Sequence, residues 1–254
     1  MKRHLISLAT LVLSLNASAA VYLNVNASGG ADGQTFDGAS WSTAYKSISD
    51  ALGALNADES GDPTLYIAKG VYYIAKSGTH TLTRDATFLG GYKGETDGDM
   101  TRDIEEYQTI ISGISNPAGK SWTRCIPVPG GFTYKTESTT EKIVVDGKLN
   151  LPAPTGEFDA YVTSSSDSYF LRVNAGCSIV ADGIKFICFN REGSPGGSAI
   201  GVNKSAKQAQ ISNCVFASVS VNDNCFLFSN FNGFSTSKKL QSCIFQLKAN
   251  FLRD

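Results

Sequence analysis

The feature that most constrains the fold is a short segment that recurs at intervals of 30 and 29 residues near the C-terminal end of the chain. Residues 182–186, 213–216 and 242–245 each place a polar residue before a strand-forming stretch that ends on phenylalanine. A fixed spacing in this range is typical of stacked repeats, in which each unit buries its inner face against its neighbours. We therefore predict an all-β, stacked-repeat architecture.

The alternation of side chains along each strand places the last phenylalanine of each segment in the interior. Phe186, Phe216 and Phe245 are then expected to form an aromatic ladder, in which each buried ring contributes about 1.5–3 kcal/mol of apolar transfer free energy. Cys214 and Cys243 are expected to fill small apolar spaces beside the ladder, and the residue before each cysteine is expected at a bend.

The protein has six cysteines, at positions 125, 177, 188, 214, 225 and 243. Their spacing lacks the tight pairs of a disulfide framework and contains no Cys-x-x-Cys motif. A bond between Cys177 and Cys188 stays open, because exported proteins fold under oxidising conditions.

The N-terminus has the pattern of an export signal. Lys2 and Arg3 precede an apolar run over residues 5–15, and Ala-Ser-Ala at 17–19 supplies a small-x-small cleavage site. The run is shorter than the roughly 20 apolar residues that cross a bilayer, and no later stretch is long enough for a transmembrane helix. We predict that residues 1–19 are a signal peptide and that the mature protein is secreted or lies at the cell surface.

The charge balance bears on the choice of partner. The formal net charge is −1, and the loss of Lys2 and Arg3 makes it −3. Without a basic run there is no electrostatic basis for binding nucleic acid. We expect a polysaccharide or a surface protein as partner, and a monomer in solution.

A short capping strand is predicted at 21–25, followed ahead of the stacked repeats by one amphipathic helix with Ser40 or Ser42 as its cap. The apolar stripe of this helix recurs at three- and four-residue intervals and consists of Trp41, Ala44, Tyr45, Ile48, Ala51, Leu52 and Leu55. We assign residues 20–60 to an N-terminal cap that covers the open end of the core, and residues 61–254 to the stacked repeats.

Residues 114–170 interrupt the repeat with several prolines and many Ser and Thr residues. We predict a loop excursion that contains one strand, at 142–145. Two interpretations remain open: a binding segment on one face of the repeats, or a flexible spacer. The chain stops at Asp254 soon after a segment of interior character, so we expect no C-terminal cap and hypothesise that the chain is part of a longer protein.

Several short segments carry a more specific signal. They are residues 40–45 (SWSTAY) with Ile48 and Ala51-Leu52, 67–72 (IAKGVY), 90–95 (GGYKGE), Arg102-Asp103 and 109–113 (TIISG). Together they resemble the N-terminal part of secreted right-handed parallel β-helix proteins of the pectin-lyase-like superfamily, including polymorphic outer-membrane proteins and adhesin-like chains. The resemblance implies this fold and a surface location. It does not decide function, because the superfamily includes lyases, hydrolases and adhesins.

A polysaccharide lyase needs a base beside a uronate carboxylate and a cation that neutralises this carboxylate. Outward-facing Lys185, with Asp182 and Arg191 nearby, is the grouping to test for catalysis. A lysine on a solvent-facing strand more often serves solubility. Tyr72, Tyr73 and Tyr92 are candidates for stacking on sugar rings, although core or cap packing explains them equally well.

Other sites find less support in the sequence. His80 is the one histidine after the signal peptide, and no nucleophile elbow accompanies it as a Ser-His-Asp triad would require. Six acidic residues between 95 and 106 suggest calcium, but Arg102 and Gln108 occupy the positions where an EF-hand requires glycine and glutamate. Arg102 and Asp103 are instead interpreted as a local ion pair, and we expect no metal or other cofactor.

Two functions follow from these observations. The leading hypothesis is a structural or adhesive protein that binds a glycan or a protein along its face. The alternative is a carbohydrate-active enzyme, a polysaccharide lyase or glycoside hydrolase, with its site in a groove along the repeats.

The signal peptide is directly testable. Expressed with its full leader in a secreting host, the protein is expected outside the cytoplasm with Ala20 as its first residue, because cleavage follows Ala19. N-terminal sequencing of the exported protein measures this. A product that keeps residues 1–19 contradicts the prediction.

Overall fold

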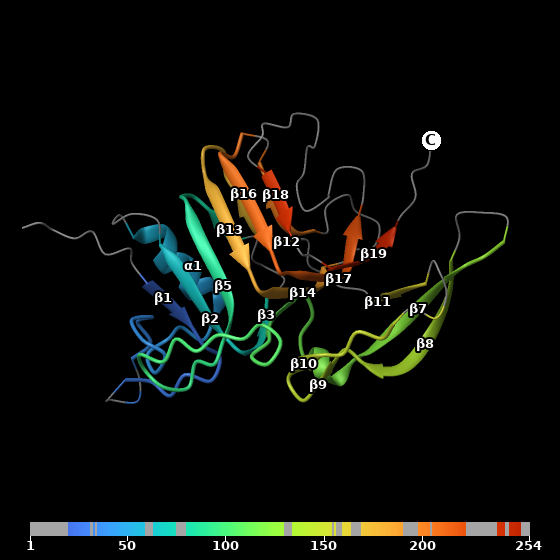
Figure 1. Cartoon of the computed structure of the whole chain (residues 1–254), viewed down its shortest axis with the longest axis horizontal. Helices are drawn as coiled ribbons and strands as arrows, with labels where there is room; N and C mark the ends of the chain where they lie inside the picture. The colour runs from blue at the N-terminus through green and yellow to red at the C-terminus, as the bar shows by residue number, and fades with distance from the viewer. Residues whose placement is uncertain are drawn as a thin grey trace, which may run out of the picture.

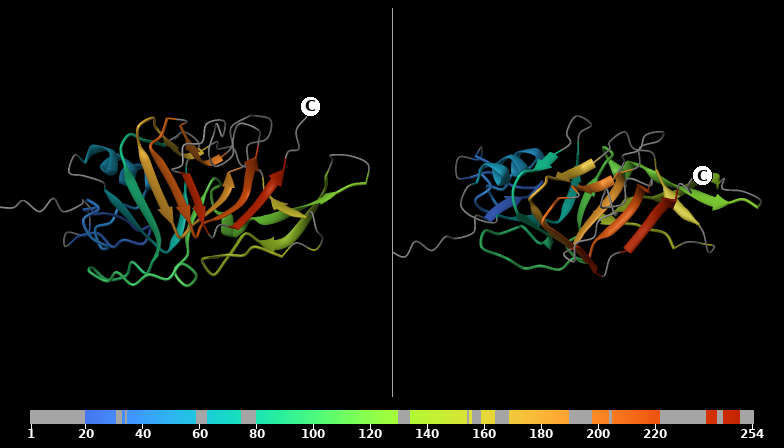
Figure 2. Two further views of the ribbon diagram at one scale, coloured as in Figure 1. Left: turned by 45° about the horizontal axis from the view of Figure 1, so that its top comes forward. Right: turned by 90° about the horizontal axis from the view of Figure 1, so that it is seen from above.

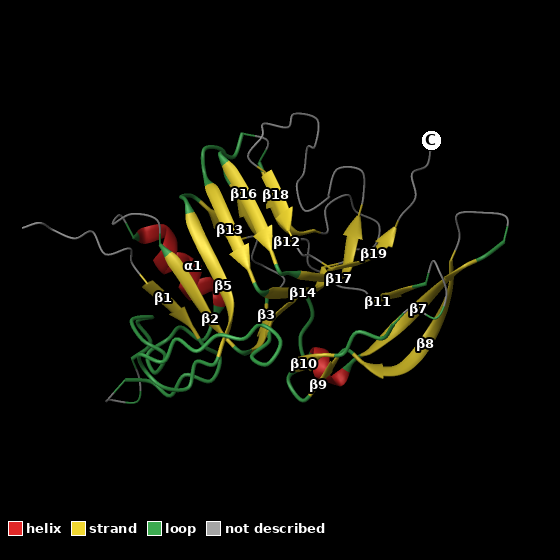
Figure 3. Cartoon of the chain, in the orientation of Figure 1, coloured by secondary structure: helices red, strands yellow, loops and turns green. Residues whose placement is uncertain are grey.

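Strands dominate the fold and lie in mainly parallel sheets (Figure 1, Figure 3). The computed structural model describes residues 20–30, 33, 35–58, 63–74, 80–129, 134–153, 155, 159–163, 169–189, 198–203, 205–221, 238–241 and 244–249. The predicted signal peptide, Arg191 and the C-terminal residues 250–254 lie outside this part. The predicted β-rich character is confirmed, and within the described residues no sheet closes on itself.

The first parallel sheet collects six strands from the whole length of the chain. In spatial order they are β1 (Ala20–Leu23), β2 (Thr64–Ala68), β5 (Ala86–Tyr92), β13 (Ser178–Asp182), β16 (Gln208–Ser212) and β18 (Lys238–Gln241). Every neighbouring pair is parallel. Figure 1 shows β2, β5, β13, β16 and β18 side by side.

Two further parallel sheets follow the same order along the chain. The second contains β3 (Gly70–Tyr73), β6 (Thr109–Ser112), β14 (Ile184–Phe189), β17 (Val215–Val221) and β19 (Ile244–Ala249). The third contains β4 (His80–Leu82), β12 (Tyr169–Val173) and β15 (Ser198–Val202). Side chains of all three sheets share one hydrophobic core.

The predicted aromatic ladder is confirmed where side chains are described. Phe186 pairs with Phe216, and Phe216 with Phe245, in the parallel register of the second sheet. The rings of Phe186 and Phe216 are fully buried and stack with centroids 5.1 Å apart. Phe170 and Phe88, which the repeat does not reveal, extend this aromatic contact toward the N-terminal end. The side chains of Phe245 and Cys243 lie outside the described part.

A sharp bend separates β13 from β14 and, one repeat later, β16 from β17. Asn213 adopts a left-handed φ of 49° between β16 and β17, and Gly183 a φ of 70° between β13 and β14. Asparagine and glycine tolerate this conformation, which confirms the expected bend before Cys214. The stretch 211–216 is therefore divided between β16 and β17, and the stretch 240–245 contains the end of β18 and the beginning of β19. Cys214 is fully buried, as predicted.

The helix α1 (Ile48–Ala57) begins later than the sequence suggested. Its N-cap is Ser47, whose side chain accepts a hydrogen bond from the Asp50 amide, so the prediction of Ser40 or Ser42 is wrong. Ser42 instead donates to the carboxylate of Asp97. The buried face of α1 joins the main core beside β1 and β4, at the N-terminal end of the first and third sheets.

Trp41, Ala44 and Tyr45 precede the helix and do not belong to its stripe. The Trp41 ring is buried and packs against Tyr22 and Tyr92, with centroids 4.7 Å and 5.7 Å away. Its indole N–H donates to the Asp99 carbonyl. The predicted stripe is therefore confirmed from Ile48 onward, because a periodic apolar pattern does not by itself mark where a helix begins.

The segment 114–170 is more ordered than a loop excursion. It contains the 3₁₀ turn Pro117–Gly119 and an antiparallel sheet in the order β11 (Ala160–Val162), β7 (Ser121–Pro127), β8 (Tyr134–Lys142). A small hairpin joins β9 (Val144–Val145) and β10 (Lys148–Leu149). Figures 1 and 2 show β7 and β8 extending away from the parallel sheets.

This antiparallel sheet is rooted in a second hydrophobic core. Trp122, Ile143 and Tyr161 pack there with Ile110, Ile187 and Ala217 of the second parallel sheet. β14, in the second parallel sheet, is consequently covered on both faces, and all of its side chains are buried. The unbroken apolar character of residues 186–189 agrees with this two-sided burial.

Cys177 and Cys188 are both buried free thiols, so the bond between them that the sequence left open is not present. Cys188 is fully buried in the second core, and burial raises the pKa of its thiol. Cys177 lies in the main core instead.

The ladder has a measurable role in stability. Phe216→Ala is expected to lower the free energy of unfolding by about 3–5 kcal/mol, because it removes a fully buried ring from a packed stack. Tyr73→Ala removes a ring that is 45% exposed and is expected to cost less than about 0.5 kcal/mol. Urea unfolding compares the two, and equal effects would show that the ladder does not hold the core.

Candidate functional site

Asp182, a predicted catalytic residue, lies at the end of β13 with both carboxylate oxygens in use. One oxygen forms an ion pair with the Arg102 guanidinium, and the other accepts a hydrogen bond from the side-chain Nδ2 of Asn213 at 2.8 Å. Arg102 also donates to the Gly90 carbonyl at 2.7 Å. Asp182 therefore joins the bends at Gly183 and Asn213 to the segment that carries Arg102.

The predicted pair of Arg102 with Asp103 is wrong, because Arg102 reaches across to Asp182. Asp103 instead accepts hydrogen bonds from the amides of Glu105 and Glu106, both at 2.9 Å. These bonds shape a turn and hold the pKa of Asp103 below its usual value.

Lys185 is not on a solvent face, which corrects the second catalytic candidate. Lys185 precedes Phe186 on β14, so its side chain points away from the main core that contains Phe186. The residue is nevertheless only 7% exposed. Its ammonium group pairs with the Glu105 carboxylate at 3.1 Å. The third candidate, Arg191, lies outside the described residues. Asp182 and Lys185 are thus paired with different residues of one segment.

The acidic residues between 95 and 106 are distributed over separate contacts. Glu95 pairs with Lys69 and Lys93, and Glu106 pairs with Lys148. The remaining carboxylates that shape this segment are those of Asp97, which accepts from Ser42, and Asp99, which accepts from Thr101. Among the described residues, no three metal-ligating side chains come together.

His80 is the first residue of β4, and its Nε2 lies 3.3 Å from the hydroxyl of Ser49 on α1. Burial lowers the pKa of His80, which favours the neutral ring. In the part of the chain that is described, no carboxylate contacts the imidazole. The arrangement lacks the acid that orients a catalytic histidine.

The three tyrosines considered for sugar stacking have different environments. Tyr72 is buried, and its hydroxyl donates to the Ala68 carbonyl at 3.0 Å. Tyr92 is buried beside Trp41. Tyr73 alone of the three is exposed, so the aromatic residues named from the sequence do not form a platform.

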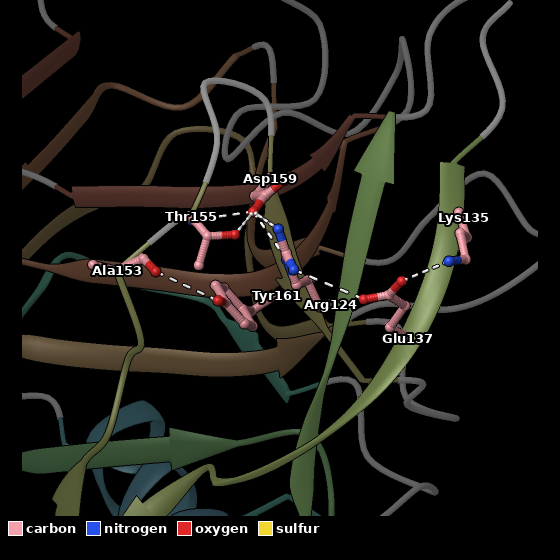
Figure 4. A network of polar contacts seen from close by, with 7 residues as sticks. All are labelled: Arg124, Lys135, Glu137, Ala153, Thr155, Asp159 and Tyr161. Atoms are coloured by element: carbon pink, nitrogen blue, oxygen red, sulfur yellow. Dashed lines mark hydrogen bonds and ion pairs between the residues drawn. The ribbon is translucent and has the colours of Figure 1, made fainter. Parts of the chain in front are cut away.

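The antiparallel sheet is the remaining candidate site, and a polar network holds it together (Figure 4). Arg124 on β7 donates to Asp159 Oδ2 from Nε at 3.0 Å and from Nη2 at 2.8 Å. On its other side Arg124 approaches Glu137 of β8 at 3.8 Å, and Glu137 pairs with Lys135 at 2.7 Å. Charges therefore alternate in sign across the sheet.

Asp159 is the buried centre of this network, with a side chain only 2% exposed. Thr155 donates to its carboxylate from both the amide and the hydroxyl. The hydroxyl bond is the main reason why the pKa of Asp159 lies below its usual value, and the bonds from Arg124 add to it. An ionised Asp159 thus joins Thr155 to Arg124 of β7 at the beginning of β11.

A second anchor joins β11 to the second parallel sheet. The Thr163 amide donates to the Ser218 hydroxyl at 2.8 Å, and this hydroxyl donates to the Thr163 carbonyl at 3.0 Å. Ser218 adopts a positive φ of 54°, at the irregularity where β17 bends. The bend directs its side chain toward β11.

The outer strand of this sheet is exposed and polar. On β8, Lys135, Thr136, Ser138 and residues 140–142 are exposed, and only β7 pairs with β8 among the described strands. A strand in this position presents unpaired backbone N–H and C=O groups together with its side chains. It can bind another extended chain or hydrogen-bond a ligand rich in hydroxyl groups.

No signal in the sequence identifies this site. Arg124 and Asp159 are separated by 35 residues, and β8 has no apolar period that marks a half-buried strand. The sequence shows that residues 136–140 are polar and rich in hydroxyl groups, but it does not predict that they form an exposed edge strand.

Comparison of the chain with known protein families, with curated proteins and with solved structures found no match. In the described residues, no helix is both long and apolar enough to cross a bilayer.

The network predicts a pH-dependent stability. Because the pKa of Asp159 is lowered by folding, its contribution is complete above the unfolded value of about 3.9 and disappears as the pH falls through the folded value. Asp159→Asn is expected to lower the urea midpoint at pH 7, with a difference that shrinks toward pH 2. Asp146→Asn, at an exposed position, is the control. A difference that does not change with pH contradicts the prediction.

Proposed function

We propose that this protein is a secreted or cell-surface protein with a structural and adhesive role, built on a right-handed parallel β-helix. Its antiparallel sheet contacts a glycan or another protein. The observation that carries this proposal is the extended strand β8, which is exposed along most of its length on a sheet anchored in its own core.

The parallel pairing supports the proposed fold. Strands of the three parallel sheets follow one another in the same order along the chain, and equivalent residues such as Phe186 and Phe216 pair in register. Bends with positive φ recur at Gly183 and Asn213, one repeat apart. These features are those of stacked repeats that bury a continuous core. The resemblance to pectin-lyase-like proteins supports the same proposal.

The N-terminal sequence supports export, since a positive start, a short apolar run and a small-x-small site precede β1. An adhesive function also suits a mildly acidic chain with many hydroxyl side chains, because neutral glycans are bound through hydrogen bonds to exposed polar groups.

The enzymatic alternative gains no support from the groups named for it. A general base must be within hydrogen-bond reach of the proton that it abstracts. Asp182 is engaged by Arg102 and Asn213, and Lys185 is buried against Glu105. These contacts serve to hold the segment 102–105 against the parallel sheets.

Beads coated with the protein test the proposal. They are expected to be retained on at least one surface in a panel of acidic polysaccharides, neutral polysaccharides and extracellular proteins, without release of sugar products. Alanine at Thr136, Ser138 and Thr140, which are exposed on β8, is expected to lower retention about tenfold or more, because such hydroxyl contacts each contribute about 0.5–1.5 kcal/mol.

A matched variant carries alanine at Lys46 and Gln208, which are exposed far from β8 in the sequence. It is expected to keep full retention. Retention that is absent on every surface would overturn the adhesive function, and product release abolished by Lys185→Ala would favour the enzyme instead.

A further inference from the structure

The antiparallel sheet has one open edge. β11, at one side, packs against β17 and β19, whereas the outer side of β8 has no neighbouring strand among the described residues. Five consecutive residues of β8, from 134 to 138, pair regularly with β7, and the register is irregular beyond them. This regular stretch is a template for one more antiparallel strand.

Charged side chains on an edge strand usually prevent such pairing, because like charges meet when two copies approach. Because β8 carries both a positive and a negative side chain, its register with a second strand decides whether the two strands can pair. Lys135 and Glu137 project on the same face and already contact each other within one chain. Which charge a second strand places opposite them decides whether the edge repels or attracts.

A second copy of β8 has few ways to pair symmetrically. Backbone N–H and C=O groups of successive residues point to opposite sides of a strand, so a two-fold antiparallel pair must be centred on a residue. Centring on Lys135 sets two ammonium groups against each other, and centring on Glu137 sets two carboxylates against each other. Both registers are unfavourable.

Centring on Thr136 sets Lys135 of each copy opposite Glu137 of the other. Arg124 already lies across from Glu137 on β7, in the register of that pair. Positive Arg124 on β7, negative Glu137 on β8 and positive Lys135 of the second copy then form a row of alternating charges. The two-fold symmetry produces this row twice. A centre at Ser138 also avoids like charges, but it requires residues 139–141, where the ladder with β7 is irregular.

We propose that the protein binds a second copy of itself through β8, paired antiparallel about Thr136. This inference goes beyond the proposed adhesive function, because it adds a second copy of the chain to the partners of β8. Each copy uses its one open edge in this two-fold pairing, so no edge is left for a third copy. The product is a dimer and not a filament. So short a contact is weak in dilute solution, and many copies on two facing surfaces strengthen it by avidity.

Sedimentation velocity over a concentration series measures self-association of the purified protein. We expect a reversible monomer–dimer equilibrium. Lys135→Glu and Glu137→Lys are each expected to weaken it about tenfold or more, because both opposite-charge contacts become like-charge contacts.

A mixture of the two variants gives the sharpest test. In the mixed dimer every ammonium group faces a carboxylate again, so association between Lys135→Glu and Glu137→Lys chains is expected to exceed that of either variant alone. This recovery also shows that both variants are folded. Weak association in the mixture as well would overturn the proposal.

Glu141→Lys makes the same charge change as Glu137→Lys outside the regular stretch, and it is expected to leave the dimer unchanged. Loss of the dimer by Glu141→Lys alone would overturn the register. A protein that stays monomeric at all concentrations but is retained on the surface panel contradicts this inference and leaves the adhesive function standing. A protein that is monomeric and also not retained contradicts both.

Discussion

The parallel register that stacks equivalent side chains in the interior is the constraint on which the rest of the structure depends. Phe186 and Phe216 lie directly across from each other on β14 and β17, and their rings stack within a core shared by three sheets. A shift of either strand by one residue would turn its ring to the opposite face and separate it from the other ring. The left-handed residues Gly183 and Asn213 preserve this register, because they place the bend at the same point of successive repeats.

The outer face of the second parallel sheet determines where the candidate site can lie. Ile110, Ile187 and Ala217 make this face apolar, and it must be covered. The segment 114–170 supplies the cover with Trp122 and Tyr161, and the strands rooted there extend beyond the core. Burial of an apolar face and presentation of the polar strand β8 are two consequences of one packing arrangement.

Charged residues in this protein mainly join segments that are distant in sequence. Arg102 with Asp182, Lys185 with Glu105, and Arg124 with Asp159 each connect parts of the chain separated by 35 residues or more. Partly buried pairs of this kind are costly to break, because the remaining charge loses its partner. The exposed pair Lys135–Glu137 differs, since both groups remain accessible at the sheet edge and can exchange partners.

The sequence by itself determined the β-rich character, the buried ladder and the bend before Cys214, because each depends on a local periodicity that repeats along the chain. It also placed Lys185 on the correct face of its strand, by alternation. Only the tertiary structure decided that this face is covered, that Arg102 pairs with Asp182, and that 114–170 forms a sheet. These outcomes depend on segments that pack from far along the chain, and neither spacing nor composition encodes which of them will meet.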